Sequence, residues 1–255
     1  MEYITVRGPS QVEDISPSLI CTDLTSLADS ARNLQDAGCR MLHVDILDGY
    51  FSPSMPIGVD MVKQLRKKCD MDFDVHIMAV ENDFFIKEMI DAGAQRICFH
   101  VETERHITKK LTEIKKAGIQ AGIALMPATS PEQFEYALEL CDFVVLMRIN
   151  PGYASSRDEK EYSFVTKKMC RLSDMIAREN YGTTITVDGR TYFERICELT
   201  AAGMDTVVGG TSNIFSREGT TRQNVDKLRV LMKKGREARR NQGNMETATG
   251  KQWKR

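Results

Sequence analysis

Apolar and polar positions alternate along the chain in two regular ways. Short, nearly continuous apolar runs such as 143–147 are typical of strands buried on both faces of a parallel sheet. Between these runs, apolar residues recur at helical spacing, as at Ile86, Met89 and Ile90, and again from Phe134 to Leu140. The pattern predicts strands that alternate with helices. We expect the strands at 15–20, 40–46, 72–77, 96–100, 120–125, 142–148, 183–188 and 205–209.

An Ala-Gly pair recurs where several of the predicted helices end. The four glycines are Gly38, Gly93, Gly118 and Gly203. Glycine suits the left-handed residue that follows a helix, because it has no Cβ to clash. The gaps between these glycines are 55, 25 and 85 residues, close to two, one and three multiples of about 27. That interval is the size of one strand-helix unit in an eight-unit barrel of ~250 residues.

The regular repeat predicts one α/β domain, a single (β/α)8 TIM barrel. A doubly wound open sheet is the alternative, but eight units without a size break favour closure. We expect an N-terminal extension at 1–14, the barrel at 15–235 and a basic C-terminal tail at 236–255.

Composition narrows the class of protein further. The 255 residues are 42% hydrophobic and 28% charged, which is enough apolar residue for a real core. The net charge of −1 argues against a general nucleic-acid binder. No apolar run approaches the ~18 residues of a membrane span, and the N-terminus does not resemble a secretory signal. We therefore expect neither nucleic acid nor membrane as a partner.

Charge and cysteine placement add two expectations. Residues 233–255 carry a charge of +6, and the rest of the chain carries −7. Basic residues suit a helix C-terminus, and a tail that binds nucleic acid or a partner is the alternative. The seven cysteines contain no CxxC pair, so we expect free thiols in a reducing cytoplasm.

Polar side chains end several of the predicted strands, where a barrel carries its reactive groups. His43 and Asp45 close the second strand on one side of it, since residues i and i+2 point the same way. His76 closes the third strand and Asp188 the seventh. Each of these residues alone could be structural. Together, two imidazoles and two carboxylates predict a site for a divalent metal ion.

The other two histidines are weaker candidates. His100 ends the fourth strand, but Glu102 lies in the loop beyond it, so we expect a minor role at most. His106 lies on a polar helix and is expected to face solvent.

Glycine-rich loops follow the last two predicted strands. They contain Gly189-Arg190 and Gly210-Thr211-Ser212. Glycines let backbone amides approach an anion, and the N-terminus of a following helix adds a favourable dipole. A tight barrel turn would explain either loop alone, but together they predict the phosphate site usual in this architecture.

Six motifs in chain order give the chain a close resemblance to the ribulose-phosphate 3-epimerase family, over about residues 14–232. They are Ile15-Ser16-Pro17-Ser18-Leu19, His43-Val44-Asp45-Ile46-Leu47-Asp48-Gly49, Asp74-Val75-His76-Ile77-Met78, Asn150-Pro151-Gly152-Tyr153, Val187-Asp188-Gly189 and Gly210-Thr211-Ser212. The last two motifs look more like the D-allulose-6-phosphate 3-epimerase branch.

The resemblance implies an isomerase that inverts C3 of D-allulose 6-phosphate or D-ribulose 5-phosphate through an enediolate. It implies that Asp45 and Asp188 are the acid/base groups, and that one divalent ion (Zn, Mn, Fe or Co) is bound. The implied metal ligands are His43, Asp45, His76 and Asp188. The implied substrate contacts are Ser18, His76, Gly152, Tyr153, Ala154, Ser155, Gly189, Arg190, Gly210, Thr211 and Ser212. A homo-oligomer is also expected, because such assemblies are common in the family.

Three departures from the family pattern concern the loops and strand ends around the expected site. Residues 152–157 and the charged run 158–161 replace a glycine-rich loop after the sixth strand. Arg190 replaces a small residue, and Arg148 ends the sixth strand where a small polar residue is usual. These departures leave open a diverged barrel that binds a sugar phosphate with altered or lost epimerase activity. A Schiff-base aldolase would need a strand-end lysine, and the predicted strand ends carry none.

Overall fold

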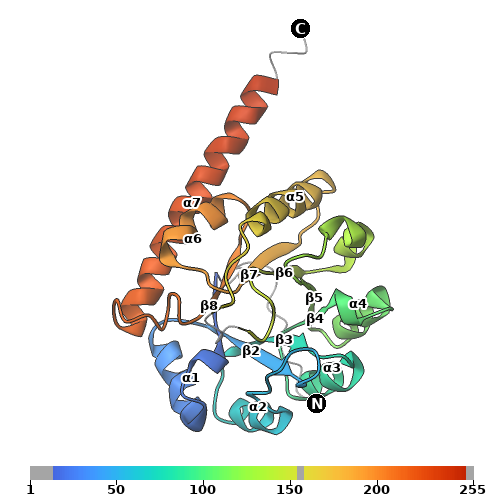
Figure 1. Ribbon diagram of the computed structural model, residues 1–255, viewed down its shortest axis with the longest axis vertical. Helices are drawn as coiled ribbons and strands as arrows, with labels where there is room; N and C mark the ends of the chain where they lie inside the picture. Colours follow the sequence, from blue (N-terminus) through green and yellow to red (C-terminus); the bar gives the residue numbers. More distant parts are fainter. Residues whose placement is uncertain (1–13, 154–157, 251–255) are drawn as a thin grey trace.

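Eight parallel strands form a barrel in the computed structural model, which describes residues 14–153 and 158–250 (Figure 1). The sheet runs in the order β1-β8-β7-β6-β5-β4-β3-β2, and a parallel bridge between Ser18 and His43 joins its two ends. The predicted (β/α)8 barrel is therefore confirmed. The strands are β1 (Ile15–Pro17), β2 (Met41–Leu47), β3 (Asp72–Met78), β4 (Arg96–His100), β5 (Gln120–Leu125), β6 (Phe143–Met147), β7 (Thr184–Asp188) and β8 (Thr206–Gly209).

Helices surround the strands on the outside of the barrel (Figure 1). The α-helices are α1 (Leu27–Asp36), α2 (Val59–Arg66), α3 (Asn82–Asp91), α4 (Ile107–Lys116), α5 (Phe164–Arg178), α6 (Phe193–Ala201) and α7 (Thr221–Gly250). Short 3-10 segments are η1 (Leu19–Cys21), η2 (Leu24–Ser26), η3 (Val101–Thr103) and η4 (Pro131–Leu140). The helix expected from Phe134 is thus a 3-10 segment. It is kinked because Phe134 has a non-helical φ of −123° and ψ of 15°, which interrupts regular i to i−4 bonding.

The glycines that set the predicted repeat do end helices. Gly38, Gly93, Gly118 and Gly203 have φ values of +93°, +76°, +77° and +129°. The amide of Gly38 bonds to the carbonyl of Gln35 at 2.9 Å, so the glycine closes the last turn of α1. The chain then enters the next strand, as the repeat predicts.

Apolar side chains pack inside the barrel beside buried polar ones, among them Arg96, Asp74 and Thr186. A small cluster of Cys98, Ala124, Phe143, Val145 and Met147 lies among the strands, and all five are buried. A larger core lies between the strands and the helices. The packed interior restricts chemistry to the mouth formed by the strand ends and the loops after them.

Helix α7 packs along α6 and projects beyond the barrel (Figure 1). Residues 236–250, expected as a tail, belong to this helix. Arg236 lies 3.2 Å from Asp14, and Arg239 lies 3.2 Å from Asp205, so part of the basic segment is bound to the acidic body. Among the described residues, no helix has the length and apolar character needed to cross a membrane.

Candidate active site at the carboxyl ends of the strands

Two neighbouring strands bring four of the polar side chains together. The register of β2 and β3 pairs His43 with Asp74 and Asp45 with His76, so imidazoles and carboxylates alternate across the pair. Asp45 Oδ1 lies 3.3 Å from His43 Nε2 and 3.6 Å from His76 Nδ1. Asp188 joins them from β7, with its Oδ2 3.8 Å from His76 Nδ1. The predicted convergence of His43, Asp45, His76 and Asp188 is confirmed.

This cluster fits a divalent metal ion. One ligand atom from each of its four residues lies within 4.8 Å of all the others. His43 Nε2 and His76 Nδ1 are buried, and neither makes a hydrogen bond with any residue that the structure describes. A buried polar atom without a partner is costly, and a cation among these nitrogens and oxygens would satisfy both imidazoles.

Side chains behind the cluster hold His43 and Asp45 in place. Asp74 Oδ2 lies 3.1 Å from His43 Nδ1 and accepts a 2.9 Å hydrogen bond from the Ser16 hydroxyl. The Ser18 hydroxyl donates to Asp45 Oδ2 at 2.8 Å. His43 therefore turns Nε2 towards the cluster, as metal-binding histidines commonly do when a carboxylate holds the other nitrogen. Sequence reasoning assigned no role to Asp74, although its same-side spacing with His76 was a usable signal.

The two aspartates of the cluster lie in different electrostatic surroundings. Burial opposes ionisation of Asp45, but His43 and His76 outweigh that effect and hold its pKa below the ordinary value. Burial and the nearby charge of Asp45 raise the pKa of Asp188, against the opposing effect of His43. Burial likewise opposes the charged form of His43, yet Asp45 and Asp74 raise its pKa well above 6.5. The site thus lowers the pKa of the Asp45 carboxyl group and raises that of the Asp188 carboxyl group.

The remaining two histidines lie in different surroundings. His106 is exposed, as predicted. His100 is fully buried and its ring packs 4.7 Å from that of Phe51. Its Nδ1 lies 3.0 Å from Glu102 Oε2, and Glu102 lies in the segment after the strand, as expected. Segment η3 begins directly after β4 and turns Glu102 back onto His100.

One buried side chain ties together the two glycine-rich loops. Asn213 donates to the carbonyl of Thr191 at 2.7 Å and accepts from the amide of Gly210 at 2.9 Å. Helix α6 begins at Phe193, close behind Gly189 and Arg190, as expected. No helix begins directly after Gly210, because turns occupy 211–219 before α7. The expected dipole of a following helix is therefore present at the first loop only.

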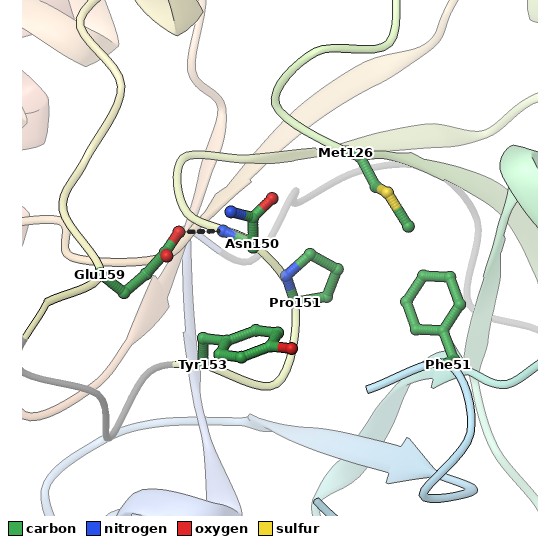
Figure 2. Close-up of a pocket in the computed structure, with 6 residues that line it drawn as sticks. All are labelled: Phe51, Met126, Asn150, Pro151, Tyr153 and Glu159. Carbon is green, nitrogen blue, oxygen red and sulfur yellow. Dashed lines mark hydrogen bonds between the residues drawn. The ribbon is translucent and has the colours of Figure 1, made fainter. Parts of the chain in front are cut away.

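A pocket of about 310 Å³ opens at the mouth of the barrel (Figure 2). It is lined by Phe51, Met126, Asn150, Pro151, Tyr153 and Glu159. Gly152, with a φ of +82°, lies so close to Ser52 that a Cβ would come within 2.2 Å of its hydroxyl oxygen. Tyr153 therefore lies at the rim next to a tightly packed turn. Of the predicted substrate contacts, Ala154 and Ser155 lie outside the described residues.

Arg148 connects the charged run to the loop after β7. It is fully buried, and its guanidinium donates to the carbonyl of Arg190 at 2.8 Å and to the carboxylate of Glu161. The Glu159 carboxylate accepts a 2.7 Å hydrogen bond from the backbone amide of Asn150 (Figure 2). Arg148 thus connects Glu161 with the backbone of Arg190, and Glu159 of the same charged run lines the pocket.

Fold and site together define the class: a (β/α)8-barrel enzyme whose His/Asp cluster can hold a divalent metal ion. The family model for the ribulose-phosphate 3-epimerase family matches residues 14–215. The chain belongs to that family, which places it among the isomerases.

Curated relatives agree with the family model. A ribulose-phosphate 3-epimerase of Aquifex aeolicus is 32% identical over 221 residues, covering 86% of this chain and 96% of that protein. A ribulose-phosphate 3-epimerase of Helicobacter pylori is 33% identical and covers 80% and 92%. A chloroplastic ribulose-5-phosphate-3-epimerase of Arabidopsis thaliana is 32% identical and covers 78% and 70%.

Solved structures share the fold at low identity. A 3-keto-L-gulonate-6-phosphate decarboxylase from Vibrio cholerae aligns with a TM-score of 0.63 and 14% identity, covering 86% of this chain and 97% of that one. An orotidine 5'-phosphate decarboxylase from Pyrococcus horikoshii aligns with a TM-score of 0.59 and 12% identity, covering 86% and 99%. These similarities concern the barrel architecture alone.

Proposed function

We propose that the chain inverts C3 of a ketose phosphate, either D-ribulose 5-phosphate or D-allulose 6-phosphate. The reaction removes the proton beside the C2 carbonyl and returns a proton to the opposite face of C3. The observation that carries this proposal is the cluster of His43, Asp45, His76 and Asp188, in which the first three residues are buried and Asp188 is partly exposed. Membership of the ribulose-phosphate 3-epimerase family supports it independently.

Asp45 and Asp188 are the proposed acid/base pair. They come from β2 and β7, which β1 and β8 separate in the sheet, so the two carboxyl groups approach the site from different strands. The Ser18 hydroxyl, 2.8 Å from Asp45 Oδ2, fixes the orientation of that carboxylate and can also contact substrate. One carboxylate on each face of the substrate suffices to remove the C3 proton and to replace it.

His43, Asp45, His76 and Asp188 would together hold one divalent ion of Zn, Mn, Fe or Co. The bound ion would supply Lewis-acid stabilisation of the negative charge that develops when the C3 proton leaves. The imidazoles of His43 and His76 lie beside the two acid/base groups, Asp45 and Asp188, and help to fix their positions. Both imidazoles are buried, so they exclude water from one side of the site.

The phosphate group is proposed to lie across the loops after β7 and β8. Gly189 and Arg190 stand before the N-terminus of α6, whose dipole and the guanidinium charge both favour an anion. Gly210, Thr211 and Ser212 form the second side, tied to the first by Asn213. Gly152, Tyr153, Ala154 and Ser155 complete the proposed substrate contacts. We also propose that the protein resides in the cytoplasm and forms a homo-oligomer. We expect it to have no nucleic-acid or membrane partner.

The deciding experiment follows exchange of the C3 proton with solvent by proton NMR. Metal-replete protein is mixed in D₂O with D-ribulose 5-phosphate or D-allulose 6-phosphate, and the faster substrate identifies the preferred sugar. Asp45→Asn and Asp188→Asn are each expected to slow exchange at least about 100-fold, because each removes one acid/base group. Asp60→Asn, on the exposed start of α2, is the matched control and should keep wild-type exchange.

Undiminished exchange in folded, metal-replete Asp45→Asn protein would rule out this mechanism. Binding of either sugar phosphate by the wild-type protein without exchange would favour a diverged sugar-phosphate-binding barrel. The network of Arg148, Glu161 and Arg190, which departs from the family pattern, is the observation behind that second candidate.

A further inference from the structure

Two side chains form a hydrogen-bonded chain behind His76, away from the cluster. His76 Nε2 lies 3.0 Å from His100 Nε2, and the two rings stack with centroids 5.1 Å apart. His100 Nδ1 lies 3.0 Å from Glu102 Oε2. Both imidazoles are fully buried, so water does not compete for these contacts.

Glu102 is fixed from its other side. Its second oxygen, Oε1, accepts the backbone amide of Met126 at 2.8 Å and the hydroxyl of Thr129. The loop that supplies these donors is itself held, because Lys168 donates to the carbonyls of Met126, Pro127 and Thr129 at 2.7, 3.2 and 3.1 Å. Because Oε1 of Glu102 already accepts these two hydrogen bonds, Oε2 is the oxygen that can accept one from His100.

The acceptor at the end of the chain determines the direction of every hydrogen bond in it. An ionised carboxylate only accepts, so His100 must donate from Nδ1 and present Nε2 as an acceptor. His76 must then donate from Nε2, which leaves the lone pair on Nδ1. His76 Nδ1 is the atom that faces Asp45 and Asp188 without a hydrogen-bond partner among the described residues.

We propose that His100 and Glu102 are positioning residues that hold His76 in the tautomer able to bind a cation through Nδ1. The inference rests on the proposed function, since it assigns a partner to one of the proposed ligands. It extends the carboxylate-histidine arrangement seen at Asp74 and His43 by one imidazole. Two separate hydrogen-bonded chains then each orient one imidazole nitrogen towards the cluster: His43 Nε2 in one and His76 Nδ1 in the other.

An isosteric substitution separates this role from simple packing. In Glu102→Gln, the side-chain amide can keep its oxygen on Met126 and Thr129 and must then offer an N–H to His100 Nδ1. His100 would donate from Nε2, and His76 would accept on Nε2 and place its proton on Nδ1, inside the cluster. Glu102→Asp keeps an acceptor-only group and is the conservative variant expected to retain more of the function.

The experiment measures the affinity of the full-length protein for Zn²⁺ by competition with a fluorescent chelator. Glu102→Gln is expected to weaken zinc binding 10- to 100-fold, the usual cost of losing an outer partner of a metal ligand. Glu104→Gln is the matched control, because Glu104 accepts the backbone amide of His106 and takes no part in the chain behind His76. This control should stay within about twofold of wild type.

Nitrogen-15 NMR of the zinc-loaded wild-type protein provides a second measurement that needs no variant. The expected pattern is a proton on Nε2 of His76 and on Nδ1 of His100, and the reverse pattern would overturn the proposal. So would a lower melting temperature in Glu102→Gln with unchanged zinc affinity, because that is the result of a purely structural role. Failure of the wild type to bind zinc or to exchange the C3 proton would instead contradict the proposed function.

Discussion

Each imidazole of the cluster has one nitrogen held from behind and the other presented to the site. His43 is held at Nδ1 by Asp74, and His76 at Nε2 by His100. The opposite choice of nitrogen follows from position, because the two rings approach the same point from adjacent strands. Fixed tautomers reduce the reorganisation needed when a charge enters the site.

The thiol next to this cluster is expected to be unreactive at neutral pH. Burial, with a smaller effect of the Asp45 charge, raises the pKa of Cys21 to about 11. The thiolate fraction at pH 8 is then ~0.001, and it grows about tenfold for each pH unit up to the pKa. Alkylation by iodoacetamide, followed by mass spectrometry of peptides, should modify the exposed Cys170 first at pH 8. Equal rates at the two cysteines would contradict this prediction.

The four ligand candidates could be predicted from the sequence, whereas their supports could not. His43, Asp45, His76 and Asp188 all end apolar runs, and strand geometry places such residues at one mouth. Asp74 and Glu102 act through contacts with other chain segments, which depend on strand register and on the turn of η3. Alternation along β3 places Asp74 on the same side as His76, but it does not show which side chain on another segment Asp74 contacts.

At the scale of elements, the described part of the connection from β6 to α5 makes contacts that a simple loop lacks. Arg148 at the end of this strand is buried, and its charge is balanced by Glu161 on the returning segment. Tyr162 adds a 3.0 Å backbone bond to the carbonyl of Arg148. The charged run 158–161 is therefore partly an internal support.

Glu161→Gln is expected to destabilise the protein by about 2 kcal/mol. The change leaves a buried guanidinium without its counter-charge, which costs about 3–5 kcal/mol in a fully buried pair. The expected loss of unfolding free energy is smaller than in a fully buried pair because the Glu161 side chain is 29% exposed. Thermal unfolding should show a fall of roughly 4–8 °C.

The matched control for this change is Glu132→Gln. Glu132 lies 3.6 Å from Arg171, and both side chains are about half exposed. Removing such a surface pair should change stability by no more than about 0.5 kcal/mol. Similar losses in the two variants would show that burial of Arg148 is irrelevant.

Every predicted strand is present, and its bounds agree with the sequence pattern to within three residues. The segment 131–140 was less predictable, because its apolar spacing fits an α-helix and the kink arises at one residue, Phe134. Helix α7 also extends through the basic segment, where the sequence lacks an apolar stripe to mark a helix.

At the scale of the whole molecule, a bound divalent ion should stabilise the barrel. The four cluster residues come from three strands, so an ion that binds only the folded state shifts unfolding by mass action. At a free zinc concentration 100 times the Kd, the gain is about 2.7 kcal/mol, or roughly 5–10 °C in melting temperature. Calorimetry of EDTA-treated protein, with and without added zinc, measures this gain.

Asp188→Asn tests whether the gain arises at the cluster. The variant removes one anionic ligand, so its zinc-dependent stabilisation should be clearly smaller than that of the wild type. An equal rise in both proteins would mean that zinc stabilises the fold from another place.

The junction of β1 with β8 has a consequence for how the chain reaches its folded state. Ile15 pairs with Val207, and Asp14 is bonded to Arg236, which is 222 positions away in the chain. Both edges of β1 can therefore be paired with other strands only after nearly the whole polypeptide has been synthesised. During synthesis β1 and β2 have unpaired backbone groups that another chain could pair with. A protein that ends before β8 should accordingly aggregate rather than fold, however complete its metal ligands.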